Sequence, residues 1–147
     1  MNIDSRKILI TILLVAIVTA VGYLGYIIIN QKPGQEFSEF YILNIEGEAK
    51  NYPQQIVLGE TVDIIIGIVN NEYKTTSYRV DVTGYSIDNR EMSIGELVHG
   101  ERFQEVVSFV PQFAGEEQKV EFWLYKNGEL EPYFTEPLRL YIDVIEP

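Results

Sequence analysis

The segment TVDIIIGIV, residues 61–69, is the strongest strand-forming part of this chain. Its alternate apolar residues share one face of an extended strand: Val62, Ile64, Ile66 and Ile68. Ile65 and Val69 make the opposite face apolar as well, which is typical of a strand in the interior of a sheet. The segment therefore predicts a central β-strand.

Short apolar segments separated by polar turns lie on both sides of this strand. The segments expected to form strands are 37–45, 53–58, 78–83, 103–110, 120–126 and 138–145. Residues 86–100 are polar with scattered apolar positions, and we expect a loop or a short edge strand there. About seven short strands over roughly 100 residues predict an all-β fold, an immunoglobulin-like antiparallel β-sandwich.

The run ILITILLVAIVTAVGYLGYIII, residues 8–29, contains no charged residue. As a helix it is about 33 Å long, enough to cross a hydrocarbon core of about 30 Å. Because lipid offers no partner for backbone polar groups, the run predicts one N-terminal transmembrane α-helix. Two alternatives stay open: a cleaved signal peptide, whose apolar region is usually shorter, and a pilin-like leader cleaved just before the run.

The charges beside the run suggest its orientation. Arg6 and Lys7 precede it and only Lys32 follows closely, which favours a cytoplasmic N-terminus. We therefore expect a single-pass protein of the cell membrane with its C-terminal domain outside. The expected parts are a cytoplasmic stub (1–7), the transmembrane helix (8–29), a linker (30–35) and an extracytoplasmic β-sandwich domain (36–147).

The expected outer domain is strongly acidic. It carries 21 of the 22 Asp and Glu but 8 of the 11 Lys and Arg, a formal charge of about −13. This argues against nucleic acid as a partner, because phosphates require a basic surface. Attraction of a basic partner, or of a divalent cation, remains open. The chain has no cysteine, so neither disulfides nor thiol catalysis are available to it.

No set of residues in the sequence indicates a catalytic or cofactor site. His99 is the single histidine and lies beside Gly100 in a predicted turn, where a solvated side chain is expected. One histidine without cysteine excludes the usual zinc sites. Acidic residues are so numerous that pairs of carboxylates arise by chance. We expect no catalytic residue, no metal site, no cofactor and no enzymatic activity.

Strand alternation places a group of aromatic residues away from the core. If Phe122 and Leu124 point inward, Trp123 and Tyr125 point outward, and Tyr141 does so on the last strand. These two strands are expected to pair, so an aromatic partner-binding patch is predicted, with Arg79 and Thr83 as its polar rim. The alternative is that aromatic residues occur here only because they favour strands.

Several sequence pieces occur in the order and spacing of a known family. They are FSEFYIL (37–43), NYP (51–53), GE (59–60), GIVNNEY (67–73) and QKVEFWLYK (118–126). In these pieces the chain resembles the archaeal membrane-protein family of unknown function 1616. The resemblance implies an outside immunoglobulin-like β-domain on a membrane base and supplies no catalytic residues. Many members are similar to multi-span proteins, whereas one span is predicted here.

A non-catalytic binding or assembly role at the cell surface is the function we expect. The order of Gly-Glu, apolar strand and Asn-Asn also resembles adhesion-type immunoglobulin-like modules. Two alternatives remain: a carbohydrate-binding or carboxylate-dependent glycan-active domain, and an accessory subunit of a larger membrane complex. The expected partner is a protein or an envelope component.

Overall fold

The computed structural model describes residues 3–30 and 34–147 and divides into two compact units, Met1–Gly34 and Gln35–Pro147. The first unit is the helix α1 (Ile3–Ile29). Within its segment Asp4–Ile29, a stretch of 18 residues has a mean hydropathy of 2.6, so the helix is long and apolar enough to cross a membrane. A signal sequence near the N-terminus fits the same description.

The boundaries of this unit differ from those expected. The helix begins at Ile3, so most of the predicted stub (1–7) is helical. Of the predicted linker (30–35), residues 31–33 lie outside the described residues, as do residues 1–2 of the stub.

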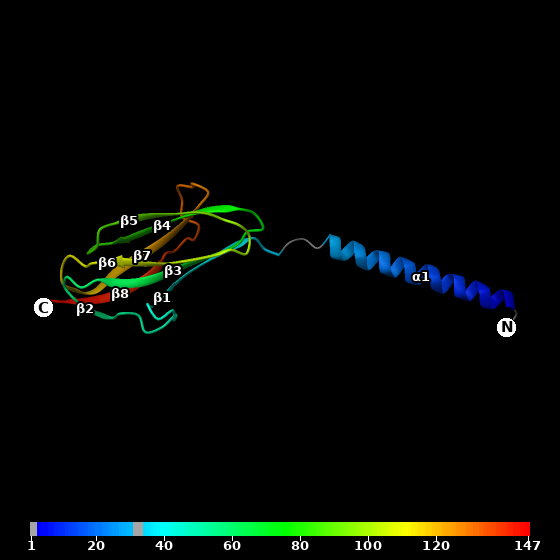
Figure 1. The fold of residues 1–147 in the computed structure, drawn as a ribbon, viewed down its shortest axis with the longest axis horizontal. Coiled ribbons are helices and arrows are strands. Elements are labelled where there is room, and N and C mark those ends of the chain that lie inside the picture. Colours follow the sequence, from blue (N-terminus) through cyan, green and yellow to red (C-terminus); the bar gives the residue numbers. More distant parts are fainter. Residues whose placement is uncertain (1–2, 31–33) are drawn as a thin grey trace. The chain divides into compact units, whose positions relative to one another are not determined.

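The second unit consists of two packed β-sheets (Figure 1). One sheet has three strands in the order β1-β3-β6, and the other has five in the order β2-β8-β7-β4-β5. The three-stranded sheet contains β1 (Phe37–Leu43), β3 (Val62–Asn71) and β6 (Arg102–Phe109). The five-stranded sheet contains β2 (Gln55–Val57), β4 (Thr76–Gly84), β5 (Arg90–Leu97), β7 (Gly115–Lys126) and β8 (Leu138–Ile145). The predicted β-sandwich is confirmed.

The core lies between the sheets and is made by alternate residues of the long strands. On β3 these are the predicted Val62, Ile64, Ile66 and Ile68, each at most 1% exposed. The five-stranded sheet contributes Tyr78, Val80, Val82, Val120, Phe122, Leu124, Leu140, Ile142 and Val144. The predicted inward faces are therefore correct, and β3 is the middle strand of its sheet, as expected.

The segment 86–100, expected to be a loop or a short edge strand, contains the edge strand β5, so the described residues form eight strands. One feature of the sheets differs from the sequence interpretation. Strand β2 pairs with β8 in the parallel direction, so the sandwich is not antiparallel at that pair. The reason is the connection: the chain leaves β1 in one sheet, passes Pro53 and reaches the free edge of β8 running in the same direction.

Candidate functional site

The outer face of the five-stranded sheet carries four of the five predicted partner-binding residues side by side. In the pairing of β4 with β7, Arg79 lies opposite Tyr125, and Asp81 lies opposite Trp123. Thr83 follows in the next row, opposite Glu121. We call Arg79, Asp81, Thr83, Trp123 and Tyr125 the outer-face block. All five side chains are half-buried.

Arg79 organises the block. Its guanidinium carbon lies 4.1 Å from the centre of the Tyr125 ring, a cation–π contact. Arg79 Nε lies 3.4 Å from Asp81 Oδ1, and Arg79 Nη1 lies 3.7 Å from Glu91 Oε2. Three residues on three strands therefore fix the orientation of one guanidinium group.

Asp81 has unused hydrogen-bonding capacity. Burial raises the pKa of its carboxyl, although the charge of Arg79 opposes this shift. Within the described residues, neither Asp81 Oδ1 nor Arg79 Nε has a hydrogen-bond partner of good geometry. A shallow hollow of about 270 Å³ opens beside them and is lined by Asp81, Thr83, Asn89, Arg90 and Glu91. Such unsatisfied groups beside a hollow favour contact with a polar ligand or partner.

Tyr141 shares the outer face but lies apart from the block. It is 55% exposed and pairs with Lys119, two outward positions along β7 from Trp123. Glu121 lies between Lys119 and Trp123 on β7, and its Oε1 forms ion pairs with Lys119 Nζ at 2.9 Å and Arg139 Nε at 3.4 Å. The outward placement of all three aromatic residues follows from alternation. The strand register, however, places the charged pair of Glu121 and Arg139 between Tyr141 and the other two aromatic residues.

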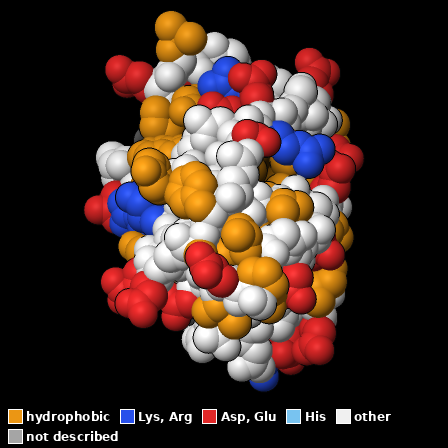
Figure 2. Space-filling view, turned by 90° about the vertical axis from the view of Figure 1, so that its left-hand side faces the viewer, with side chains coloured by type: hydrophobic (Ala, Val, Ile, Leu, Met, Phe, Trp, Pro, Cys, Tyr) orange, Lys and Arg blue, Asp and Glu red, His pale blue; other side chains and the backbone are white. Residues whose placement is uncertain are grey.

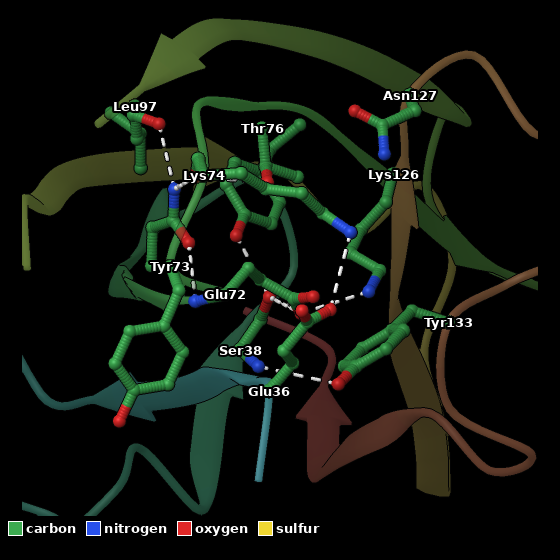
Figure 3. Close-up of polar contacts among 12 residues, drawn as sticks. Glu36, Ser38, Glu72, Tyr73, Lys74, Thr76, Leu97, Lys126, Asn127 and Tyr133 are labelled. Carbon is green, nitrogen blue, oxygen red and sulfur yellow. Dashed lines mark hydrogen bonds and ion pairs between the residues drawn. The ribbon is translucent and has the colours of Figure 1, made fainter. Parts of the chain in front are cut away.

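A second polar group joins the two sheets at the end where β1 begins (Figure 3). Glu72, 3% exposed, follows the end of β3, and its Oε1 lies 2.8 Å from Lys126 Nζ at the end of β7. Ser38 of β1 donates its hydroxyl proton to Glu72 Oε1 at 2.7 Å. Tyr78 of β4 lies 2.7 Å from the same hydroxyl and therefore acts as the donor to it. We call these four residues the inter-sheet cluster.

The loop after β7 closes this cluster. The Tyr133 hydroxyl accepts the Ser38 N–H at 3.2 Å, and Lys126 Nζ lies 3.7 Å above the Tyr133 ring. Although burial raises the pKa of Glu72, hydrogen bonds from Lys126 and Ser38 outweigh it, so the net pKa is lowered. The Ser38 hydroxyl is fully engaged and Lys126 is paired. The cluster therefore holds the sheets together rather than presenting a free nucleophile.

His99 and the exposed Tyr85 each stack against another aromatic side chain. His99 Nδ1 accepts the Tyr73 N–H at 3.3 Å, and the two rings stack with centres 4.5 Å apart. Figure 2 shows the end of the body that lies to the left in Figure 1, where hydrophobic side chains gather among acidic ones. Tyr85, 90% exposed, lies in the loop after β4 and meets the Phe113 ring at 5.0 Å. Among residues 3–30 and 34–147, no three His, Asp or Glu side chains gather as metal ligands would.

Comparisons with known proteins identify a family and a fold. The family described as a domain of unknown function, DUF1616, matches residues 31–143. No curated protein matches the chain. Among solved structures, alpha-2-macroglobulin of E. coli is similar with a TM-score of 0.54 and 15% identity, over 74% of this chain and 7% of that one. Our chain thus corresponds to a small part of that protein.

Two structures of a single domain are similar over most of both chains. The CARDB domain of the PF1109 protein from Pyrococcus furiosus, crystallised in complex with di-metal ions, gives a TM-score of 0.51 at 11% identity. The similarity covers 76% of this chain and 90% of that domain. The solution structure of the same domain gives 0.51 at 13% identity, over 76% and 98%. These likenesses support the immunoglobulin-like β-sandwich and carry no function by themselves.

Proposed function

The chain belongs to the DUF1616 family, and we propose that it is a membrane-anchored binding or assembly module without catalytic activity. In this proposal α1 anchors the chain in the cell membrane, and the β-sandwich lies outside and contacts a partner protein. The apolar length of α1 supports the anchor, and the inter-sheet cluster supports a body built as a rigid scaffold.

The outer-face block is the observation that carries this proposal. Trp, Tyr and Arg are the residue types most enriched among interface residues whose truncation costs about 2 kcal/mol or more. Here all three types adjoin on neighbouring strands, and the contact between Arg79 and Tyr125 fixes two of their side chains before any partner arrives. Pre-ordered side chains lose less conformational entropy on binding. The block therefore suits a protein interface.

The charges around the block indicate the chemistry of the partner. Asp81 and Glu91 line the hollow beside it, and Asp81 Oδ1 has no hydrogen-bond partner within the described body. Arg79 and Arg90 already balance the charges of Asp81 and Glu91 at the hollow. A Lys or Arg side chain from the partner would donate the missing hydrogen bond, and the acidic excess of residues 36–147 would attract it. We therefore propose a protein partner that presents a basic group over Asp81 and an apolar surface over Trp123.

Cross-linked co-purification from native membranes tests this role. We expect Trp123→Ala to lower the recovery of the partner about tenfold or more, the equivalent of about 1.4 kcal/mol. Tyr141→Ala tests whether the interface extends across the charged pair of Glu121 and Arg139. Phe37→Ala is the matched control, because Phe37 is an exposed aromatic residue of β1 in the other sheet. Wild-type recovery with both Trp123→Ala and Tyr141→Ala, at unchanged melting temperature, would refute this interface.

Protease treatment of intact cells tests the proposed anchor and orientation. With the anchor retained and the body outside, added protease digests the body while the chain remains in the membrane fraction. A mature N-terminus beyond α1 would indicate a cleaved signal sequence, and a protected body would indicate the opposite orientation. Either result would contradict the anchored arrangement.

A further inference from the structure

The outer edge of β6 is an open strand edge, and we propose that it binds an extended segment of another protein by strand addition. The segment would carry alternating apolar and basic side chains. This surface is separate from the outer-face block, because β6 belongs to the three-stranded sheet.

Three of the four sheet edges are blocked or short. On β1, the Tyr133 hydroxyl accepts the Ser38 N–H at 3.2 Å, and the Tyr52 hydroxyl donates to the Ile42 carbonyl at 2.8 Å. Strand β2 has only three residues. Strand β5 is interrupted by a shift of register opposite the Tyr78–Arg79 step. Capping groups, short length and bulges are the means by which proteins prevent pairing at an edge.

The remaining edge, β6, is continuous over eight residues and has β3 as its one neighbour in the described sheets. In an antiparallel pair, alternate residues direct both backbone groups to the same side. The backbone N–H of Ser38 and the backbone C=O of Ile42 bond to tyrosine hydroxyls, so the backbone groups of the even-numbered residues of β1 face away from β3. The backbone hydrogen bonds between β1 and β3 therefore join odd-numbered residues of both strands. The even-numbered residues of β3 therefore bond to odd-numbered residues of β6. Gln104, Val106 and Ser108 consequently direct their N–H and C=O groups outward.

Side chains along this edge define what it would recognise. On the outer face, Val106 is 45% exposed and continues a cross-strand apolar row formed with Ile65 and Leu43. A hollow of about 150 Å³ beside it is lined by Ile65, Gln104, Glu105 and Val106. The exposed Glu105 belongs to the opposite face of the strand. An added strand would thus place an apolar side chain beside Val106 and a Lys or Arg beside Glu105.

A second copy of this chain is a poor occupant of the edge. Antiparallel self-pairing centred on Glu105 would place the two Glu105 carboxylates opposite each other, and like charges in that position destabilise a pair. The acidic excess of residues 36–147 adds repulsion between copies. A basic segment from another protein meets the opposite charge and gains main-chain hydrogen bonds.

The test uses the full chain in non-ionic detergent and a short synthetic peptide in which valine and lysine alternate. We expect it to bind and to slow amide hydrogen exchange at Gln104, Val106 and Ser108. The same peptide with every second amide N-methylated retains the charge but cannot pair along an edge. We expect that peptide to bind about tenfold more weakly or worse. Equal binding of both peptides, or protection elsewhere in the chain, would overturn the proposal.

Two substitutions locate the site. Val106→Pro removes an outward N–H without removing a bond to β3, and proline is tolerated at strand edges. It should weaken peptide binding about tenfold or more. Glu105→Lys should reverse the preference toward a valine–glutamate peptide, a gain that unfolding cannot imitate. Ile145→Ala, at an exposed apolar position of β8 in the other sheet, is the control and should leave peptide binding unchanged. Unreversed preference in Glu105→Lys would also overturn the proposal.

Discussion

Lys126 Nζ lies 2.8 Å from Glu72 Oε1, and this contact joins the end of β7 in one sheet to the end of β3 in the other (Figure 3). The side chains are 13% and 3% exposed, so both charges are largely removed from water. Such a pair is tolerated only when hydrogen bonds satisfy its charges, and Ser38 donates one of them. In a chain without cysteine, this contact and the apolar core hold the sheets together.

Removing one partner of this pair should destabilise the body strongly. Lys126→Met leaves the Glu72 carboxylate buried without its counter-charge, and we expect a loss of about 3–5 kcal/mol in the free energy of unfolding. Urea denaturation measures this loss. Lys50→Met is the matched control, because Lys50 and Glu48 form an ion pair whose side chains are 67% and 43% exposed. That pair should contribute about 0–1 kcal/mol. Equal losses would show that burial does not determine the importance of the Glu72 pair.

The same pair should make the stability of the body sensitive to acid. The pKa of Glu72 is lowered in the fold, because hydrogen bonds from Lys126 and Ser38 overcome the opposing effect of burial. A lowered pKa stabilises the fold above the ordinary glutamate value of 4.5, and this contribution is lost as the pH falls through the folded value. Urea midpoints measured on acidification should fall, and Glu72→Gln should show a smaller fall.

Asp81 supplies a control of opposite sign. Burial raises its pKa, so protonation of Asp81 favours the fold as the pH falls through the raised value. Asp81→Asn should therefore make the acid-induced loss of stability steeper, whereas Glu72→Gln makes it shallower. Parallel curves for the wild type and Glu72→Gln would contradict the assignment of the acid sensitivity to Glu72.

The inward faces of the strands were predictable, because strand side chains alternate with a fixed period of two. The apolar residues at Val62, Ile64, Ile66 and Ile68 fill one face, and all are buried as predicted. No knowledge of which strands pair was needed for this result. The sandwich class followed from the number and spacing of such segments for the same reason.

The inter-sheet cluster was not predictable from the sequence. Glu72 and Lys126 are 54 residues apart, and each lies in or beside a predicted turn, where a charged residue is expected to be solvated. Their meeting depends on how the two sheets are aligned, and no local pattern carries that information. Asn70 precedes Glu72 by two residues and Asn127 follows Lys126 directly, and asparagine is typical of turns. The sequence therefore predicts turns at both places.

The division of the outer aromatic residues has a similar origin. Asn127-Gly128 predicts a tight hairpin, and both residues do have positive φ angles of 52° and 71°. The chain does not return directly, however, because β8 begins only at Leu138, opposite Phe122. This long connection sets the register that places Tyr141 opposite Lys119 rather than near Trp123.

Substitutions at two neighbouring isoleucines should separate the core from the outer face of β3. Ile66 is fully buried, so Ile66→Ala should cost about 2–5 kcal/mol of unfolding free energy. Ile65 is half-buried on the outer face, opposite Leu43 and Val106. Ile65→Ala should cost clearly less, because solvent already reaches this face. Denaturation of both variants checks the difference, and a larger loss for Ile65→Ala would show that another layer covers the outer face.

His99 should be dispensable for partner binding and of limited importance for stability. It is exposed, it accepts one long hydrogen bond from the Tyr73 N–H, and its ring stacks on Tyr73. Tyr73 has a φ of 56°, so this contact steadies a backbone conformation that is unfavourable for tyrosine. His99→Ala should therefore cost about 0.5–1.5 kcal/mol, the usual range for an aromatic pair.

His99→Phe is the matched variant, because it keeps a stacking ring and loses the acceptor nitrogen. We expect it to recover most of the stability lost in His99→Ala, and we expect both variants to recover partners from membranes at the wild-type yield. Thermal melting and co-purification measure the two properties separately. Lost partner recovery in both variants at wild-type melting temperature would assign the imidazole a direct role, since neither stacking nor unfolding would then account for the loss.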